Sequence, residues 1–267
     1  MTEDLPPTRS LIAEYKLQAS KSLGQNFITD HNILDKIVRL SGLSPGENVV
    51  EIGAGPGGLT RALLRAGAGQ VIAIEPDPRT LPLLERIVAH YPDRMHLILK
   101  HAEDVEVDKL PTPAKIVANL PYNVASLLLV QWLEAKPRWW SDMTLLFQKE
   151  VASRLAAPVG SAAYGRLSIL TQALCSVEIL WTLPPDAFVP KPKVKSSLVK
   201  LTPLPDRSTI DVKKLGHITA QAFSKRRKML RTTLKDLLGD LEDLGIDPKL
   251  RAQNLSVETY IALSQRL

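Results

Sequence analysis

The chain has 267 residues, 45% of them apolar, and a formal net charge of +6, which is enough for one sizeable α/β domain with a small appendage. Residues 1–4 include two acids and no apolar run follows them, and the longest uncharged run, residues 116–133, contains Pro121 and several polar residues, so we expect neither a secretory signal nor a membrane span. The single cysteine, Cys175, excludes an internal disulfide, and we expect a protein of the reducing cytoplasm.

The first 44 residues precede the first predicted strand. They contain a predicted helix over residues 32–41 and, before it, the sequence Lys21-Ser22-Leu23-Gly24-Gln25-Asn26-Phe27. We expect this stretch to form a loop that folds back over a site on the sheet.

Residues 48–148 alternate short β-branched runs with longer segments of helical spacing, a pattern typical of βαβ units around a parallel sheet. The predicted strands are residues 48–52, 71–75, 96–99, 115–119 and 143–147. The predicted helices are residues 59–66, 81–91 and 125–133. The apolar residues 162–183 are predicted to form a helix and then to complete the sheet.

A glycine-rich loop follows the first strand, in the order Glu51-Ile52-Gly53-Ala54-Gly55-Pro56-Gly57-Gly58, and Glu75 ends the next strand. Glycines permit a tight turn and close approach to a ligand, and an acid at the second strand end can accept hydrogen bonds from ribose hydroxyls. The pattern also fits a dinucleotide site. The Glu51 carboxylate favours S-adenosylmethionine over a dinucleotide, because it would attract a sulfonium and repel a pyrophosphate.

The third and fourth strand ends carry Glu103-Asp104 and Asn119-Leu120-Pro121-Tyr122. An acid after the third strand can accept a hydrogen bond from an adenine amine. The Asn119 amide oxygen, with a carbonyl of Leu120 or Pro121, can accept the N–H groups of an exocyclic amine, while Tyr122 offers a ring for stacking. The bland alternative is an ordinary strand-to-helix turn with a buried tyrosine.

Phe188 lies in the proline- and lysine-rich residues 185–196, and we expect it in an exposed loop where it clamps a flipped base against Tyr122, rather than in the core. Residues 191–235 hold thirteen basic and two acidic residues, which indicates a polyanion contact. The candidate RNA-binding residues are Lys191, Lys193, Lys195, Lys225, Arg226, Arg227, Lys228 and Arg231. The last five are predicted to lie on a helix beside a stripe of buried leucines, the alternative being a solvated helix face.

The segment Thr202-Pro203-Leu204-Pro205-Asp206 is predicted to be a linker, because its prolines remove hydrogen-bond donors. We therefore predict a catalytic domain over residues 1–204 and a helical RNA-binding domain over residues 205–267.

These motifs, in this order over residues 20–235, resemble the ribosomal RNA adenine dimethyltransferases, and among them the bacterial small-subunit type. The resemblance implies a Rossmann-like S-adenosylmethionine-dependent methyltransferase fold with a mostly parallel sheet and a small all-α C-terminal domain. It implies N6,N6-dimethylation of two adjacent adenosines in the 3′-terminal hairpin loop of 16S rRNA, within the immature small ribosomal subunit. The implied cofactor contacts are Asn26, Ile28, Gly53, Glu75, Asn119 and Glu103, with Asp104 the alternative to Glu103.

We expect no DNA, membrane or metal partner, and a monomer, because no heptad or exposed apolar stripe requires an oligomer. Three alternatives stay open. The chain could be an RNA-binding assembly factor with secondary or lost catalysis, a dinucleotide-dependent oxidoreductase, or a resistance methylase of large-subunit rRNA.

Overall fold

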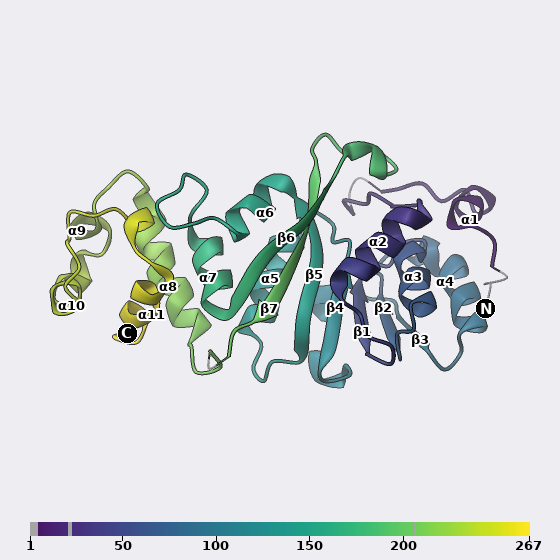
Figure 1. The fold of residues 1–267 in the computed structure, drawn as a ribbon, viewed down its shortest axis with the longest axis horizontal. Helices are drawn as coiled ribbons and strands as arrows, with labels where there is room; N and C mark the ends of the chain where they lie inside the picture. The colour runs from purple at the N-terminus through teal and green to yellow at the C-terminus, as the bar shows by residue number, and fades with distance from the viewer. Residues whose placement is uncertain (1–4, 21–22, 206) are drawn as a thin grey trace.

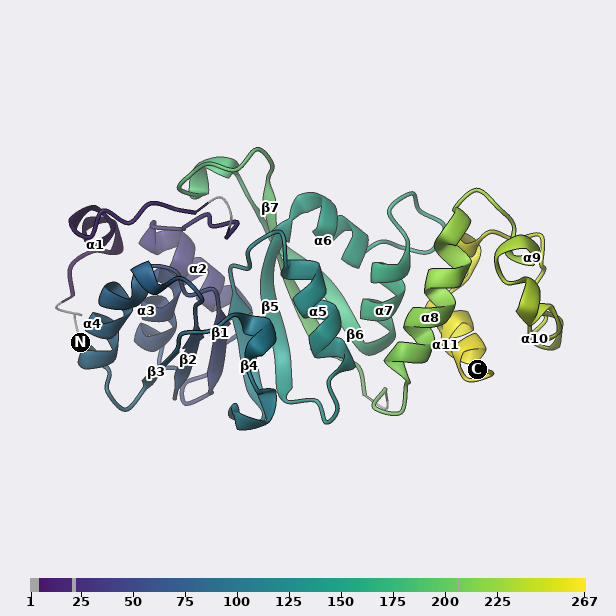
Figure 2. The ribbon, with the colours of Figure 1, turned by 180° about the vertical axis from the view of Figure 1, so that it is seen from behind.

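The computed structural model describes residues 5–20, 23–205 and 207–267, which form a seven-stranded sheet with helices on both faces and a helical end (Figures 1 and 2). The acidic start, Lys21 and Ser22 of the predicted loop, and Asp206 of the predicted linker lie outside the described residues. Within the described ranges, no helix is both long and apolar enough to cross a bilayer.

The sheet has the strand order β3-β2-β1-β4-β5-β7-β6. Five strands run parallel: β1 (Val49–Ile52), β2 (Val71–Ile74), β3 (Met95–Ile98), β4 (Ala114–Ala118) and β5 (Trp140–Gln148). Each lies within a few residues of its predicted range, so the mostly parallel α/β fold is confirmed. The order reverses between β1 and β4, and a crevice at such a point is where this class of sheet binds ligands.

Two antiparallel strands complete the sheet, β6 (Cys175–Leu183) and β7 (Ser196–Pro203). The first was predicted, as was the helix before it, α7 (Arg166–Leu174). The second was not, and the prediction that Thr202 and Pro203 belong to a linker is wrong. Pro203 is the last residue of β7 and lies opposite Cys175, and a proline is tolerated at a strand end because no further ladder bond depends on its nitrogen.

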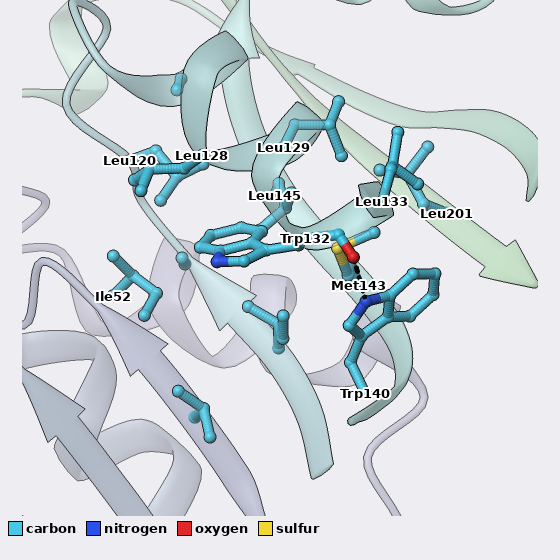
Figure 3. Close-up of a cluster of buried hydrophobic side chains, with 14 of the residues drawn as sticks. Ile52, Leu120, Leu128, Leu129, Trp132, Leu133, Trp140, Met143, Leu145 and Leu201 are labelled. Atoms are coloured by element: carbon cyan, nitrogen blue, oxygen red, sulfur yellow. Dashed lines mark hydrogen bonds between the residues drawn. The ribbon is translucent and has the colours of Figure 1, made fainter. Parts of the chain in front are cut away.

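One face of the sheet is covered by α2 (His31–Ser41), α3 (Gly58–Arg65) and α4 (Leu81–His90), and the other by α5 (Ala125–Glu134) and α6 (Lys149–Leu155). Neighbouring strand residues face opposite sides of the sheet. Val49 therefore packs in the first core, against α2, α3 and α4, and Val50 in the second core, against α5 and α6. In the second core, Trp132 of α5 accepts through its backbone carbonyl from the Trp140 indole N–H at 3.0 Å (Figure 3). A short helix, α1 (Thr8–Glu14), lies at the N-terminal end (Figure 1).

A third hydrophobic core joins α7 to the C-terminal helices α8 (Val212–Ala222), α9 (Leu230–Thr233), α10 (Leu238–Asp243) and α11 (Val257–Ser264). Tyr164 and Ile169, from before residue 204, belong to this core together with Leu215 and Tyr260 from after it. The division into residues 1–204 and 205–267 stays a proposal.

The predicted single basic helix across residues 222–231 is wrong. Residues 223–225 form a 3-10 turn, residues 226–228 a turn, and Met229 is extended before α9 begins. The chain leaves the helix because Met229 forms a β-bridge with Arg251, and the Leu230 backbone N–H donates to the Leu250 carbonyl at 2.8 Å. Of the predicted leucine stripe, Leu230, Leu234 and Leu241 are buried, whereas Leu238 is 36% exposed.

Candidate active site

The candidate active site lies at the carboxyl ends of β1, β2 and β4, where the glycine loop, Glu75 and Asn119 come together. A cavity of about 40 Å³ is lined by Gly53, Glu75 and Asn119, and also by residues 23–27, which lie over it. A second cavity of about 200 Å³ shares Leu23, Gly53 and Pro121 with the first and extends to Glu103. Together they form one recess with a narrow part near the acceptor motif and a wider part near the third strand.

Three of the four glycines of the loop, Gly53, Gly55 and Gly57, have conformations that other residues avoid. Gly53 has φ +75° and Gly55 φ +54°, in the left-handed region. A Cβ on Gly55 would come within 3.1 Å of the Phe27 ring, so the loop also needs glycine for contact with the chain above it. The backbone N–H of Gly55 is then free to point at the end of β2.

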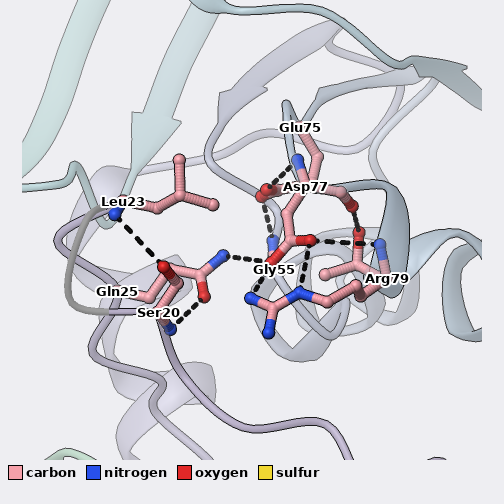
Figure 4. Close-up of polar contacts among 8 residues, drawn as sticks. Ser20, Leu23, Gln25, Gly55, Glu75, Asp77 and Arg79 are labelled. Atoms are coloured by element: carbon pink, nitrogen blue, oxygen red, sulfur yellow. Dashed lines mark hydrogen bonds and ion pairs between the residues drawn. The ribbon is translucent and has the colours of Figure 1, made fainter.

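Glu75 is 3% exposed, and both of its carboxylate oxygens accept backbone hydrogen bonds, from Gly55 at 2.7 Å and from Asp77 at 2.9 Å (Figure 4). Burial raises the pKa of Glu75, and the two backbone bonds oppose that shift. Asp77 is held by Arg79 at 2.7 Å, and this pairing lowers the pKa of Asp77. The carboxylate of Glu75 is therefore fixed in direction at the wall of the cavity.

Glu51 is 1% exposed and accepts a hydrogen bond from the Thr60 hydroxyl at 2.6 Å. Burial raises its pKa to about 8, which favours the neutral side chain at pH 7 in the protein without cofactor. The predicted carboxylate beside a bound cation stays a prediction. Glu51 lines a small cavity with Ile28, Gly53 and Asn119. A cation bound there would favour its ionised form.

Asn119 is oriented by the loop above it. Its side-chain Nδ2 donates to the backbone carbonyl of Asn26 at 2.9 Å, which commits the N–H end of the amide and leaves Oδ1 as the acceptor. Leu120, Pro121 and Tyr122 line the same cavity. Tyr122 is half-buried, its hydroxyl shares a hydrogen bond with the Ser196 hydroxyl at 2.5 Å, and burial raises its pKa.

Phe188 is 2% exposed and packs in the core with Ile28 and Leu183, so its prediction as an exposed loop residue is wrong. The physical reason is the next residue, Val189, which forms a two-bond β-bridge with Phe27, each N–H to O distance being 2.8 Å. The bridge holds Val189 against Phe27, which is one of residues 23–27 that line the cavity. Stacking of Phe188 on a base stays a prediction.

The candidate RNA-binding side chains are all exposed, in two groups. Lys191, Lys193 and Lys195 lie between β6 and β7, and Lys191 pairs with Asp186 at 2.6 Å. Lys225, Arg226, Arg227, Lys228 and Arg231 lie at the turn before α9 and in α9 itself. Arg226 also donates to the carbonyl of Ala162.

Two residues of the site had no role in the sequence interpretation. Gln25 was part of a quoted motif without a function, and its Nε2 donates to Asp77, 52 positions away, at 2.9 Å. Asp77 follows Glu75 by two residues, a spacing that could have marked it as a partner of the same loop.

Asp104 does not line the wide cavity, whereas Glu103 does.

Comparisons with known proteins give a consistent result. The family model described as ribosomal RNA adenine dimethylase matches residues 16–267. The chain is 47% identical to a ribosomal RNA small subunit methyltransferase A of Cereibacter sphaeroides, covering 99% of this chain and 98% of that protein, and 48% identical to the one of Dinoroseobacter shibae, with the same coverage.

Solved structures agree with this. A dimethyladenosine transferase from Plasmodium falciparum superposes with a TM-score of 0.80 at 26% identity, covering 89% of this chain and 95% of that one. The 23S rRNA methyltransferase ErmE superposes with a TM-score of 0.70 at 24% identity, covering 91% and 99%, which bears on the fold alone.

Proposed function

Because this chain belongs to the ribosomal RNA adenine dimethylase family, we propose that it transfers methyl groups from S-adenosylmethionine to the N6 atoms of two adjacent adenosines in the 3′-terminal hairpin loop of 16S rRNA. The products are N6,N6-dimethyladenosines, made in the cytoplasm while the small ribosomal subunit is being assembled. The family and its structural relatives are S-adenosylmethionine-dependent enzymes.

The residues of the recess fit this cofactor. Glu75, fixed by two backbone bonds, suits a ribose. We favour Glu103 for the adenine amine because it lines the wide cavity, with Asp104 as the alternative. Asn26, Ile28 and Gly53 line the recess or the adjoining small cavity beside Glu51. When bound, S-adenosylmethionine supplies a methyl group on a positively charged sulfur.

The acceptor side rests on one observation, the orientation of Asn119. Since its N–H end is held by the Asn26 carbonyl, its oxygen can accept an N–H of the adenine amine. A carbonyl of Leu120 or Pro121 can accept the second N–H, and the two bonds favour the pyramidal amine, whose nitrogen lone pair is available for attack. The protein thus contributes position and exclusion of water, and no side-chain base is needed, because a methylated anilinium-like nitrogen loses its proton readily.

Tyr122 offers its half-buried ring to the extruded base, with the hydroxyl anchored on Ser196. The proposed clamp with Phe188 on the opposite face requires the segment around η4 (Pro185–Ala187) to lift Phe188 from the core. The exposed lysines on the same segment, Lys191, Lys193 and Lys195, would contact the RNA backbone and favour that movement.

The test is mass spectrometry of adenosines from the rRNA of cells that lack this chain, followed by methylation of their small subunits with the purified protein. We expect N6,N6-dimethyladenosine to be missing from the 3′-terminal hairpin and to return with the wild-type protein. An Asn119→Ala protein should not restore it. Unchanged dimethyladenosine in the deleted cells would contradict the proposal and favour an assembly factor without catalysis.

A further inference from the structure

Gln25 lines the narrow part of the recess and is linked by hydrogen bonds toward both Glu75 and Asn119. Its side chain bonds to Asp77, two residues after Glu75, and its neighbour Asn26 holds Asn119. Figure 4 shows the amide of Gln25 between Ser20 and the Asp77 carboxylate. Gln25 therefore connects Glu75 with Asn119, the two side chains that must be correctly placed relative to each other in the proposed reaction.

The orientation of the Gln25 amide follows from its two partners. Nε2 donates to Asp77 Oδ2 at 2.9 Å, and Oε1 accepts from the Ser20 backbone N–H at 2.8 Å. A carboxylate only accepts and a backbone N–H only donates, so the reversed amide would break both bonds. The backbone N–H of Gln25 also donates to the Ser20 carbonyl at 3.1 Å, and these bonds hold Gln25 against Ser20.

The bonds of Gln25 to Ser20 and Asp77 set the position of the next two residues. Asn26 presents its carbonyl to Asn119 Nδ2, and Phe27 pairs with Val189. On the other side, the Asp77 backbone N–H donates to Glu75 Oε1. Every link from Glu75 to Asn119 is therefore a hydrogen bond or a peptide bond between adjacent residues.

We propose that Gln25 is a positioning residue for methyl transfer: its bond to Asp77 holds the Asn26 carbonyl where it aims the Asn119 oxygen at the acceptor amine. This inference rests on the proposed function and assigns a residue to it. Gln25 lines the narrow cavity with its neighbours in residues 23–27, but its amide is occupied by Asp77 and Ser20, so it acts through Asn119.

The sharpest test is Gln25→Glu, which keeps the size of the side chain but replaces the donor with an oxygen facing the Asp77 carboxylate. We expect the single-turnover rate of methylation of immature small subunits to fall about tenfold to a hundredfold, as for loss of a hydrogen bond to a charged group. The dissociation constant for S-adenosylhomocysteine should stay within about threefold of wild type, because a positioning role affects the reaction more than binding.

A double-mutant cycle with Asp77→Asn separates this role from a general structural one. In the double variant, the new amide at position 77 can donate to the new carboxylate at position 25, which restores the bond in the reverse direction. Arg79, 49% exposed, can turn its freed nitrogen to solvent. When Asp77→Asn is already present, Gln25→Glu should therefore lower the single-turnover rate of methylation by less than about threefold. The matched control is Gln131→Glu on α5, an exposed glutamine that receives the same charge.

A Gln25→Glu protein as fast as wild type, or an equal loss with and without Asp77→Asn, would overturn the inference. A wild-type protein that does not methylate these subunits would instead overturn the proposed function. Asp77 is 2% exposed and pairs with Arg79, so we expect the variants to unfold at different temperatures, and all rates are compared at a temperature where thermal unfolding shows every protein to be folded. Gln25→Ala provides a further variant without added charge.

Discussion

At the scale of single residues, the chemistry of the site depends on how burial and hydrogen bonds change polar side chains. Glu51 and Glu75 are both buried acids at neighbouring strand ends; Glu75 accepts backbone bonds from two residues, whereas the bonds to Glu51 come from Thr60 alone. Burial outweighs the bonds from Thr60 at Glu51, and its pKa rises to about 8. If a cation binds beside this neutral acid, as we propose, cofactor binding is expected to release a proton.

The sign of this coupling can be tested. With a pKa raised to about 8, Glu51 is mostly protonated at pH 7 in the free protein, and a bound sulfonium or ammonium group favours its carboxylate. We expect S-adenosylmethionine binding at pH 7 to release about one proton and the affinity to rise with pH until it levels off above pH 8. Calorimetry in buffers of different ionisation enthalpy measures the proton directly.

Glu51→Gln is the matched control, because it keeps the shape and the Thr60 bond but cannot ionise. Its proton release should be close to zero and its affinity nearly independent of pH between about 6 and 8. Proton uptake by the wild type, or equal release by both proteins, would show that Glu51 does not ionise on binding.

Some contacts of the site could be predicted from the sequence and others could not. Gly53, Glu75 and Asn119 were predicted to meet because parallel strands end at one edge of the sheet. The pairing of Gln25 with Asp77 spans 52 positions and depends on the path of a loop, for which the sequence holds no periodic signal. The burial of Phe188 likewise depends on the bridge between Val189 and Phe27.

At the scale of elements, strands with β-branched runs and helices with apolar spacing were predicted within a few residues. The strand β7 was missed because its apolar core, Leu198 to Leu201, lies between a lysine-rich loop and two prolines, whose local signals favour a loop. The basic run was wrongly predicted as one helix because its leucines have helical spacing, while the bridge from Met229 to Arg251 is a long-range contact. Tertiary pairing overrode local pattern in both cases.

The helix α5 offers a direct measure of what holds the elements together. Leu129 is fully buried on the sheet, whereas Leu127, two residues earlier, is 62% exposed. Leu129→Ala should lower the free energy of unfolding by about 2 to 5 kcal/mol, because it removes buried methyl groups and leaves a cavity.

Leu127→Ala is the control on the same helix and should change the free energy of unfolding by less than about 0.5 kcal/mol. Urea unfolding followed by tryptophan fluorescence measures both, since Trp132 and Trp140 lie in the same core. Equal effects of the two substitutions would mean that α5 does not pack on the sheet as described.

The turn before α9 carries a cationic cluster whose contribution to RNA binding can be measured. Replacing Lys225, Arg227 and Lys228 with alanine removes three exposed charges and spares Arg226, which bonds to Ala162. We expect weaker binding to small-subunit RNA and a salt slope shallower by about 0.7 to 0.9 for each phosphate that the protein no longer neutralises. Binding of S-adenosylhomocysteine should not change.

The matched control removes the same charge elsewhere, at Arg39, Lys109 and Arg138, which are exposed on other parts of the sheet domain. Its salt slope should stay close to that of the wild type. If both triple variants reduce the slope equally, the RNA responds to total charge and not to this cluster.

In the whole molecule, the third core contains side chains from before and after residue 204, so the stabilities of the two predicted domains are coupled. Tyr164 is fully buried and donates to the carbonyl of Leu255 at 3.0 Å, across the predicted boundary at residue 204. The rings of Tyr164 and Phe223 lie 6.5 Å apart, and Lys136 near the end of α5 donates to the carbonyl of Ile210. A cut at residue 204 would expose one wall of this core.

A fragment of residues 1–204 should therefore unfold at lower urea concentration than the full chain and expose Tyr164, Ile169 and Leu170 to solvent. Burial of such side chains is worth about 1.5 to 3 kcal/mol each, so the loss is a large fraction of the stability of a typical domain. Urea unfolding of the fragment and the full chain, with dye binding to report exposed apolar surface, measures it. We expect the full chain to unfold in one transition, because α7 belongs to both parts. Two transitions, the later one matching that of the fragment, would instead identify residues 1–204 as an independent domain and the C-terminal helices as a separable attachment.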